Sequence, residues 1–114
     1  MIAGFVITGN SAKRVLIRAA GPALAQFGVR TALARPQLTL FSGSTVVATN
    51  AGWSTSADAA GIREAAAGVG AFAFGATSVD SALLVNLAPG AYTAQVAGVG
   101  GTTGVALLEV YEVP

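Results

Sequence analysis

The most constraining feature of the sequence is an alternation of apolar and polar residues between Ser81 and Ala97. Apolar side chains recur at every second position in two runs: Leu83, Val85 and Leu87, and then Tyr92, Ala94 and Val96. A period of two places each run on one face of a β-strand. Pro89 and Gly90, between the runs, suit the two central positions of a type II turn. We therefore expect a β-hairpin here and an all-β fold.

The rest of the chain predicts further short strands, at Ile2–Thr8, Lys13–Arg18, Gln37–Phe41, Thr45–Thr49 and Val105–Val113. Residues 57–67 are typical of a helix instead, because Ser56 is a suitable N-cap and apolar residues then recur at helical spacing. The pattern predicts a single domain over residues 1–114. We expect an antiparallel β-sandwich of jelly-roll or Ig-like type, with about seven or eight strands and one short Ala-rich helix.

The expected core comes from the inward positions of these strands. In the second strand, Val15 and Ile17 share one face, and Leu16 and Arg18 share the other. The full expected set is Leu16 or its neighbours Val15 and Ile17, followed by Leu38, Leu40, Val46, Leu83, Val85, Val96, Leu108 and Val110.

The composition removes most catalytic chemistry. The chain has no histidine, no cysteine, and only five acidic and six basic residues, for a net charge of +1. Since histidine is the commonest general base and metal ligand, we expect no enzymatic activity, no catalytic residue, no metal and no cofactor. A net charge this small provides no field that would attract nucleic acid or a membrane surface.

Charged residues make up 10% of the chain, whereas ordinary soluble domains carry about 25%. The surface therefore consists largely of alanine, threonine, serine, glycine and asparagine. Such a surface suits a domain that is covered by neighbours, by copies of itself or by glycan. The alternative explanation is a GC-rich genome that raises the alanine content, and the sequence favours neither.

No apolar stretch approaches the ~20 residues that a membrane-spanning helix needs. Lys13 and Arg14 follow the first apolar run, which is the wrong order for a signal peptide. We therefore expect a mature or excised piece of a longer protein.

Three polar residues are candidates for an oxygen-rich calcium site: Asn50, Asp58 and Asp80. They are not clustered in the sequence, which argues against such a site. Arg18, next to an apolar segment, is expected to act as a structural clamp on backbone carbonyls rather than as a ligand-binding group. The glycines of residues 98–104 lead into a strand and not a helix, so they predict a flexible loop and not a phosphate site.

Trp53 is the only tryptophan, and it follows Asn50 in a loop of small residues. Exposed, it would form a platform on which a sugar ring stacks, with Asn50 as a polar contact and Tyr92 and Tyr111 as further aromatic residues. Buried, it would close one end of the sandwich core, which is the more frequent role of such a residue.

The chain also carries an ordered set of motifs: Ile2-Ala-Gly-Phe-Val-Ile7, Val15-Leu-Ile-Arg-Ala-Ala-Gly-Pro22, Pro36-Gln-Leu-Thr-Leu-Phe41, Val69-Gly-Ala-Phe72, Pro89-Gly-Ala-Tyr-Thr-Ala-Gln-Val96 and Gly101-Thr-Thr-Gly-Val-Ala-Leu-Leu-Glu-Val-Tyr-Glu112. Together they resemble a repeat module of large secreted proteins from Verrucomicrobia and related bacteria. The module is distantly similar to the bacterial pre-peptidase C-terminal (PPC-like) β-sandwich domains.

The resemblance implies an extracellular or cell-surface location and a non-catalytic β-sandwich. Some of the similar domains bind calcium, and some bind polymers. Two departures matter. Asn50-Ala-Gly-Trp53 stands where family copies carry an acidic Asn-Asp-Asp-Trp-like stretch, which argues against inherited metal binding. The strand-like segment that usually precedes Ile2 is absent, so we expect one open sheet edge.

We therefore expect a structural or self-assembly role, as a surface repeat or fibre subunit that packs against its own copies or sister domains. Both terminal strands are apolar and are the expected assembly edges, through Ile2, Phe5, Ile7, Val105, Leu107 and Tyr111. The alternative is a carbohydrate-binding module, with Trp53 and Asn50 as glycan contacts. The exposure of Trp53 distinguishes the two.

Overall fold

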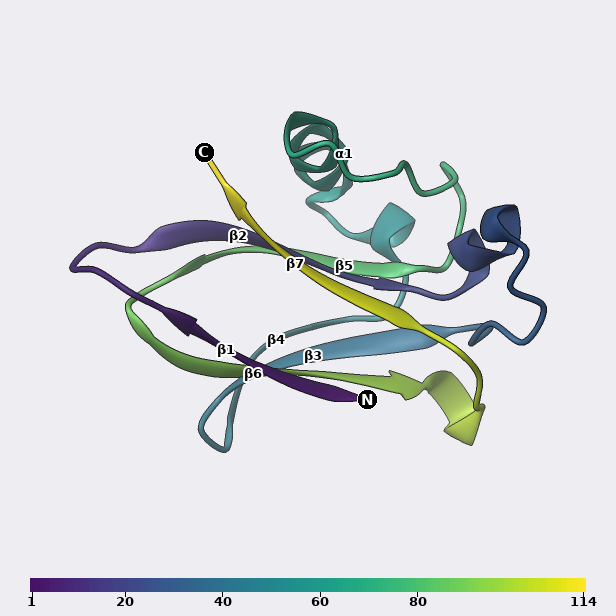
Figure 1. Ribbon diagram of the computed structural model, residues 1–114, viewed down its shortest axis with the longest axis horizontal. Coiled ribbons are helices and arrows are strands. Elements are labelled where there is room, and N and C mark those ends of the chain that lie inside the picture. Colours follow the sequence, from purple (N-terminus) through teal and green to yellow (C-terminus); the bar gives the residue numbers. More distant parts are fainter.

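The computed structural model describes residues 1–114 as two antiparallel β-sheets packed face to face (Figure 1). The strands are β1 (Ile2–Ile7), β2 (Lys13–Ala20), β3 (Pro36–Ser42), β4 (Thr45–Asn50), β5 (Ser81–Leu87), β6 (Gly90–Gly98) and β7 (Leu107–Val113). One sheet has the order β1-β6-β3-β4, and the other has the order β5-β2-β7. The all-β sandwich expected from the sequence is confirmed.

One α-helix and three short 3₁₀ helices complete the secondary structure: α1 (Ala59–Gly68), η1 (Pro22–Phe27), η2 (Trp53–Thr55) and η3 (Val99–Gly101). The helix begins two residues later than predicted, with Asp58 rather than Ser56 at its N-cap. The hydroxyl of Ser56 accepts a hydrogen bond from the Asp58 backbone N–H, at 3.2 Å, and so stabilises the preceding turn.

The segment Ser81–Ala97 forms two strands, but they do not pair with each other, and the prediction of a β-hairpin is wrong. β5 pairs with β2, whereas β6 lies between β1 and β3, so the connection at Ala88 and Pro89 crosses from one sheet to the other. Leu87 of β5 and Val96 of β6 belong to one buried cluster between the sheets. Because β5 and β6 lie in opposite sheets, their apolar faces meet across the interior and are both buried.

The main core lies between the two sheets. Its buried members are Val15, Ile17, Ala19, Leu33, Leu38, Leu40, Leu83, Leu87, Ala94 and Val96. Val85 and Leu108 are only half-buried against this cluster.

Two residues of the expected core are exposed. Val46 is 55% exposed because β3 and β4 shift register between Leu40 and Phe41, so that Val46 pairs with Phe41 on the outer face. Val110 is 41% exposed because β7 is an edge strand and no further strand covers it.

A third layer covers only one of the sheets. In Figure 1, α1 and the loops around it lie on the outer face of the β5-β2-β7 sheet, whereas the outer face of the other sheet carries no such layer. A second buried cluster lies beneath that layer and comprises Leu16, Trp53, Ile62, Ala65, Ala66 and Ala82. β2 is therefore buried on both faces over most of its length. β5 contributes to both clusters as well, through Ala82 on one face and Leu83 and Leu87 on the other.

Candidate functional site

Trp53 is buried, with 2% of its surface exposed, and packs in the cluster beneath α1. Its indole N–H donates to the Ser78 hydroxyl at 3.2 Å. On the solvent side, the guanidinium carbon of Arg63 lies 5.4 Å from the centroid of the ring. Trp53 therefore presents no exposed aromatic platform at the protein surface for a sugar ring.

The Asn50 side chain, the second expected glycan contact, is used within the fold. Its amide donates to the Gly52 carbonyl at 3.2 Å, and its oxygen accepts from the Ala82 backbone N–H at 3.1 Å. These bonds tie the end of β4 to β5 in the opposite sheet. Asn50 thus holds the loop that carries Trp53 in place.

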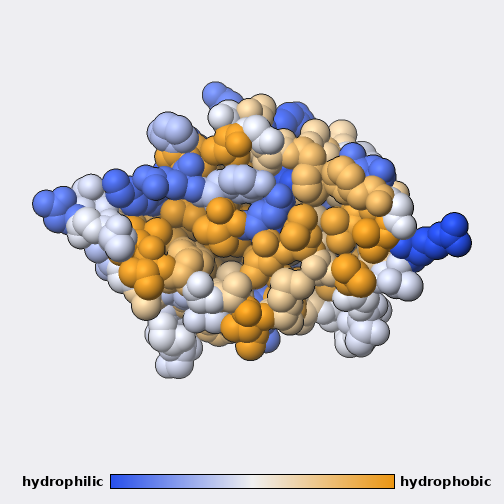
Figure 2. All heavy atoms as spheres, in the orientation of Figure 1, coloured by the Kyte–Doolittle hydropathy of each residue, from blue (hydrophilic) through white to orange (hydrophobic).

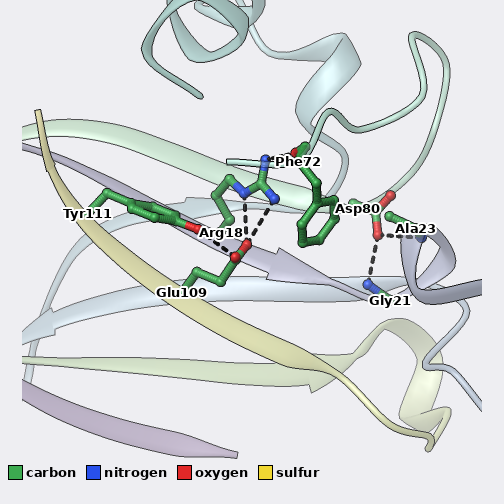
Figure 3. A network of polar contacts seen from close by, with 7 residues as sticks. All are labelled: Arg18, Gly21, Ala23, Phe72, Asp80, Glu109 and Tyr111. Atoms are coloured by element: carbon green, nitrogen blue, oxygen red, sulfur yellow. Dashed lines mark hydrogen bonds and ion pairs between the residues drawn. The ribbon is translucent and has the colours of Figure 1, made fainter. Parts of the chain in front are cut away.

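Asp80 lies immediately before β5 and is completely buried. Its carboxylate accepts three hydrogen bonds. Its Oδ1 accepts from the backbone N–H groups of Gly21 (2.7 Å) and Ala23 (3.0 Å) (Figure 3). Its Oδ2 accepts from the Ser78 hydroxyl at 2.7 Å. A side chain at position 21 would collide with the Leu33 carbonyl oxygen, so glycine is required beside the carboxylate. The arrangement joins η1 to the loop before β5, and both carboxylate oxygens accept hydrogen bonds from the fold.

The other two candidates for calcium do not join Asp80. Asp58 lies exposed at the start of α1, and the oxygen of Asn50 already accepts from Ala82. No group of three or more histidine, cysteine, aspartate or glutamate side chains is placed to hold a metal ion.

Arg18 is the second buried charge of this layer, with 1% of its surface exposed on the outer face of β2. Its Nη1 donates to the Phe72 carbonyl at 2.6 Å, which is the backbone contact expected of a clamp. Its guanidinium carbon lies 4.5 Å from the ring centroid of Phe72 and 3.9 Å from that of Phe74. These contacts hold the segment after α1 against the sheet.

Glu109 of β7 neutralises the charge of Arg18 but does not accept hydrogen bonds from all the donors of its guanidinium group. Arg18 Nε donates to Glu109 Oε1 at 2.9 Å, while Oε2 accepts from the Tyr111 hydroxyl at 2.6 Å (Figure 3). Arg18 Nη2 also lies 2.9 Å from Oε1, but its N–H direction misses that oxygen, and Nη2 is buried without a hydrogen-bond partner. Tyr111 thus takes the oxygen that a two-pronged arginine–carboxylate pair would use.

The same contact changes the acidity of Tyr111. The hydrogen bond to Glu109 raises the pKa of the phenol, and burial and the negative charge of Glu109 raise it further, against a smaller lowering by Arg18. Tyr111 was expected at an assembly edge, but its hydroxyl is engaged inside this network.

A cavity of about 190 Å³ lies beside Arg18, between the helix and the segment that follows it. Its walls are Arg18, Trp53, Ile62, Arg63, Ala66, Ala67, Ala71, Ala73 and Phe74. Two arginines and no carboxylate line it. Sequence reasoning missed this cavity because its residues come from β2, η2, α1 and the loop after α1, and no local spacing relates them.

The two strands expected at assembly edges are both sheet edges. β1 is the outer strand of the four-stranded sheet, and β7 is the outer strand of the other. Because β5 contacts β3 and β4, the two strands share the opposite side of the sandwich, which faces the viewer in Figure 1. Six of the ten large exposed apolar residues lie on or beside these two strands: Met1, Ile2, Val6, Val105, Leu107 and Val110. Figure 2 shows apolar surface across this side of the molecule.

The free edge of β1 can be assigned residue by residue. Met1 and Val96 exchange both backbone hydrogen bonds, at 2.8 and 3.2 Å. In an antiparallel pair such bonded pairs alternate with non-bonded ones, so the main-chain groups of Ile2, Gly4 and Val6 point away from β6. The side chains of Phe5 and Ile7 pack against the core, and the Phe5 ring stacks on Tyr92 with ring centroids 5.7 Å apart.

The β7 edge is less uniform. Val105 lies before the strand, where its backbone bonds to Thr31 and Leu33, and Leu107 is exposed at the start of β7. Glu112 is exposed further along and lies 3.8 Å from Lys13. A charge on an edge strand disfavours pairing with another strand, so β1 is the less protected of the two.

No helix in the structure combines the length and apolar character needed to cross a membrane. Comparison with protein-family models, with curated proteins and with solved structures finds no match to this chain.

Proposed function

We propose that this domain is a non-catalytic assembly module that associates with a second copy of itself through the free edge of β1. The observation that carries the proposal is an uncharged edge strand whose main-chain groups at Ile2, Gly4 and Val6 have no strand beside them. Charged side chains and prolines are the features by which edge strands normally resist pairing. Between Ile2 and Ile7 there is no charged residue and no proline.

A second copy is the partner that best fits the chemistry of this edge. Antiparallel pairing of β1 with the same strand of another molecule has two-fold symmetry and brings no like charges together. The net charge of +1 adds little repulsion between copies. The exposed side chains of Ile2 and Val6 would lose contact with water in such a pair.

The carbohydrate-binding alternative has less support. Its proposed platform, Trp53, is buried, and the amide of Asn50 is bonded within the chain. Of the two tyrosines, Tyr92 is half-buried against Phe5 and Tyr111 bonds to Glu109. The burial of Trp53 therefore favours assembly over glycan binding.

The non-catalytic part of the proposal rests on the small inventory of acids and bases. The chain lacks histidine and cysteine, and the carboxylates of Asp80 and Glu109 are occupied by donors of the fold. An extracellular or cell-surface location remains a prediction that rests on the sequence resemblance.

Light scattering over a concentration series tests the assembly. We expect the wild-type chain to form dimers or larger species, and Val6→Lys to shift it to monomer by placing a charge on the free edge. Val47→Lys is the matched control, because Val47 is exposed on β4 at the other edge of the same sheet. Added salt should change the association little, because β1 carries no ion pairs.

Two results would contradict the proposal. One is a strictly monomeric wild-type chain at high concentration across salt and pH. The other is an association that Val6→Lys leaves intact, which would place the contact elsewhere.

A further inference from the structure

The cavity beside Arg18 is separate from the β1 edge and has a size that suits a small ligand. Its volume is about 190 Å³, and seven of its nine lining residues are apolar. An apolar cavity of about 150 Å³ in another protein binds benzene. A single aromatic ring, or an aliphatic group of similar size, therefore fits here between the alanines of α1 and Phe74.

The charges around the cavity are all of one sign. Arg63 is exposed at the rim and has no carboxylate within ion-pair distance. Arg18 lines the interior, and no acidic residue does. Glu109 compensates the charge of Arg18 from the β7 side, so Arg63 supplies the uncompensated positive charge.

A second observation points to an acceptor atom. Arg18 Nη2 is buried and lies 2.9 Å from Glu109 Oε1 in an ion pair, but no acceptor forms an aligned hydrogen bond with it. A buried donor without an acceptor costs free energy, and most such groups in folded proteins are satisfied. A bound oxygen ligand would remove that cost.

We propose that this cavity binds a small monocarboxylate with one aromatic ring or a similarly sized apolar group. The apolar group lies against Trp53 and Phe74, and the carboxylate is held by Arg63 beside the guanidinium of Arg18, which lines the same cavity. Arginine suits this role because its planar donors match the geometry of a carboxylate.

Trp53 provides the readout, since it is the only tryptophan and lines the cavity. Titration with phenylacetate should give a saturable change in its fluorescence. The neutral analogue 2-phenylethanol should bind about tenfold more weakly, because it leaves Arg63 unpaired. Amide spectra recorded by NMR should place the shifts at residues around Trp53 and Phe74.

Arg63→Gln should weaken phenylacetate binding about tenfold and leave 2-phenylethanol unchanged, while Arg63→Lys should restore part of the affinity. Arg30→Gln removes the same charge from an exposed position outside the cavity, and should bind as the wild type does. Both substitutions change exposed side chains, so the fold is kept.

Three results would overturn this proposal. They are the absence of saturation up to the solubility of the acid, equal binding of the acid and the alcohol, and an equal effect of the Arg30 and Arg63 variants. Phenylacetate binding does not depend on the oligomeric state, so its failure leaves the assembly proposal unaffected.

Discussion

Arg18 and Asp80 are two buried charges at the same end of one sheet face, and they are satisfied to different degrees. Asp80 accepts three hydrogen bonds within its own neighbourhood, two of them from backbone N–H groups. Arg18 has a carboxylate, a carbonyl and two aromatic rings around it, yet its Nη2 has no hydrogen-bond partner. The two side chains are equally buried, but only Arg18 has a polar atom without a hydrogen bond.

The difference indicates which site is structural and which is open to a ligand. Both oxygens of Asp80 accept hydrogen bonds from groups of the fold, so we assign Asp80 to holding two loops together. The guanidinium of Arg18 lines a cavity and has one nitrogen without an aligned hydrogen bond, so we assign the ligand to its side of the layer.

The first prediction concerns Asp80. Asp80→Ala should lower the free energy of unfolding by about 3–5 kcal/mol, because the buried donors at Gly21, Ala23 and Ser78 lose their acceptor. Urea unfolding followed through Trp53 fluorescence measures the loss. Asp58→Ala, on an exposed aspartate, should cost less than about 1 kcal/mol. Similar losses of unfolding free energy in the two variants would show that the hydrogen bonds of Asp80 do not stabilise the fold.

The second prediction concerns the pair formed by Arg18 and Glu109. Arg18→Met should cost about 2–3 kcal/mol, since the Phe72 carbonyl and Glu109 both lose their partner. Replacing both residues by methionine should cost less than Arg18→Met alone, because no unpaired carboxylate then remains. A double-mutant cycle by urea unfolding measures this coupling, and additive losses would mean that Glu109 does not compensate Arg18.

The smallest effect should appear at alkaline pH. The raised pKa of Tyr111 means that the folded chain favours the neutral phenol, mainly through the hydrogen bond to Glu109. This contribution is complete below pH about 10 and is lost as the pH rises through the pKa of the folded state. The wild-type chain should therefore lose more stability above pH about 10 than Tyr111→Phe does. Tyr92 is the matched control, because its phenol donates to a backbone carbonyl. The Tyr92→Phe variant should lose as much stability above pH about 10 as the wild type does. Equal alkaline losses in the wild type and Tyr111→Phe would contradict the assigned contact.

Much of the local structure follows from sequence alone. A period of two in the apolar residues predicted strands within a few residues of their observed bounds, because side chains on a strand alternate between faces. The sequence left open which face of the second strand enters the core, and the structure buries Val15 and Ile17 on one face and Leu16 on the other. The lack of histidine and cysteine, which limits the available chemistry, is also a property of the sequence alone.

The partners of these strands were decided by the tertiary structure. β5 and β6 are neighbours in sequence but belong to different sheets, and their apolar faces meet across the core. The shift between Leu40 and Phe41 likewise turned Val46 outward, and no local pattern marks it.

The buried charges show the same limit most clearly. The sequence placed Arg18 on a strand and indicated a clamp. It did not identify Glu109, 91 positions away, or the Phe72 carbonyl, 54 positions away. Asp80 likewise binds backbone groups of Gly21 and Ala23, almost 60 positions earlier in the chain. A residue's own periodicity determines which face it occupies, whereas its hydrogen-bond partners depend on which distant segments the fold brings to that face.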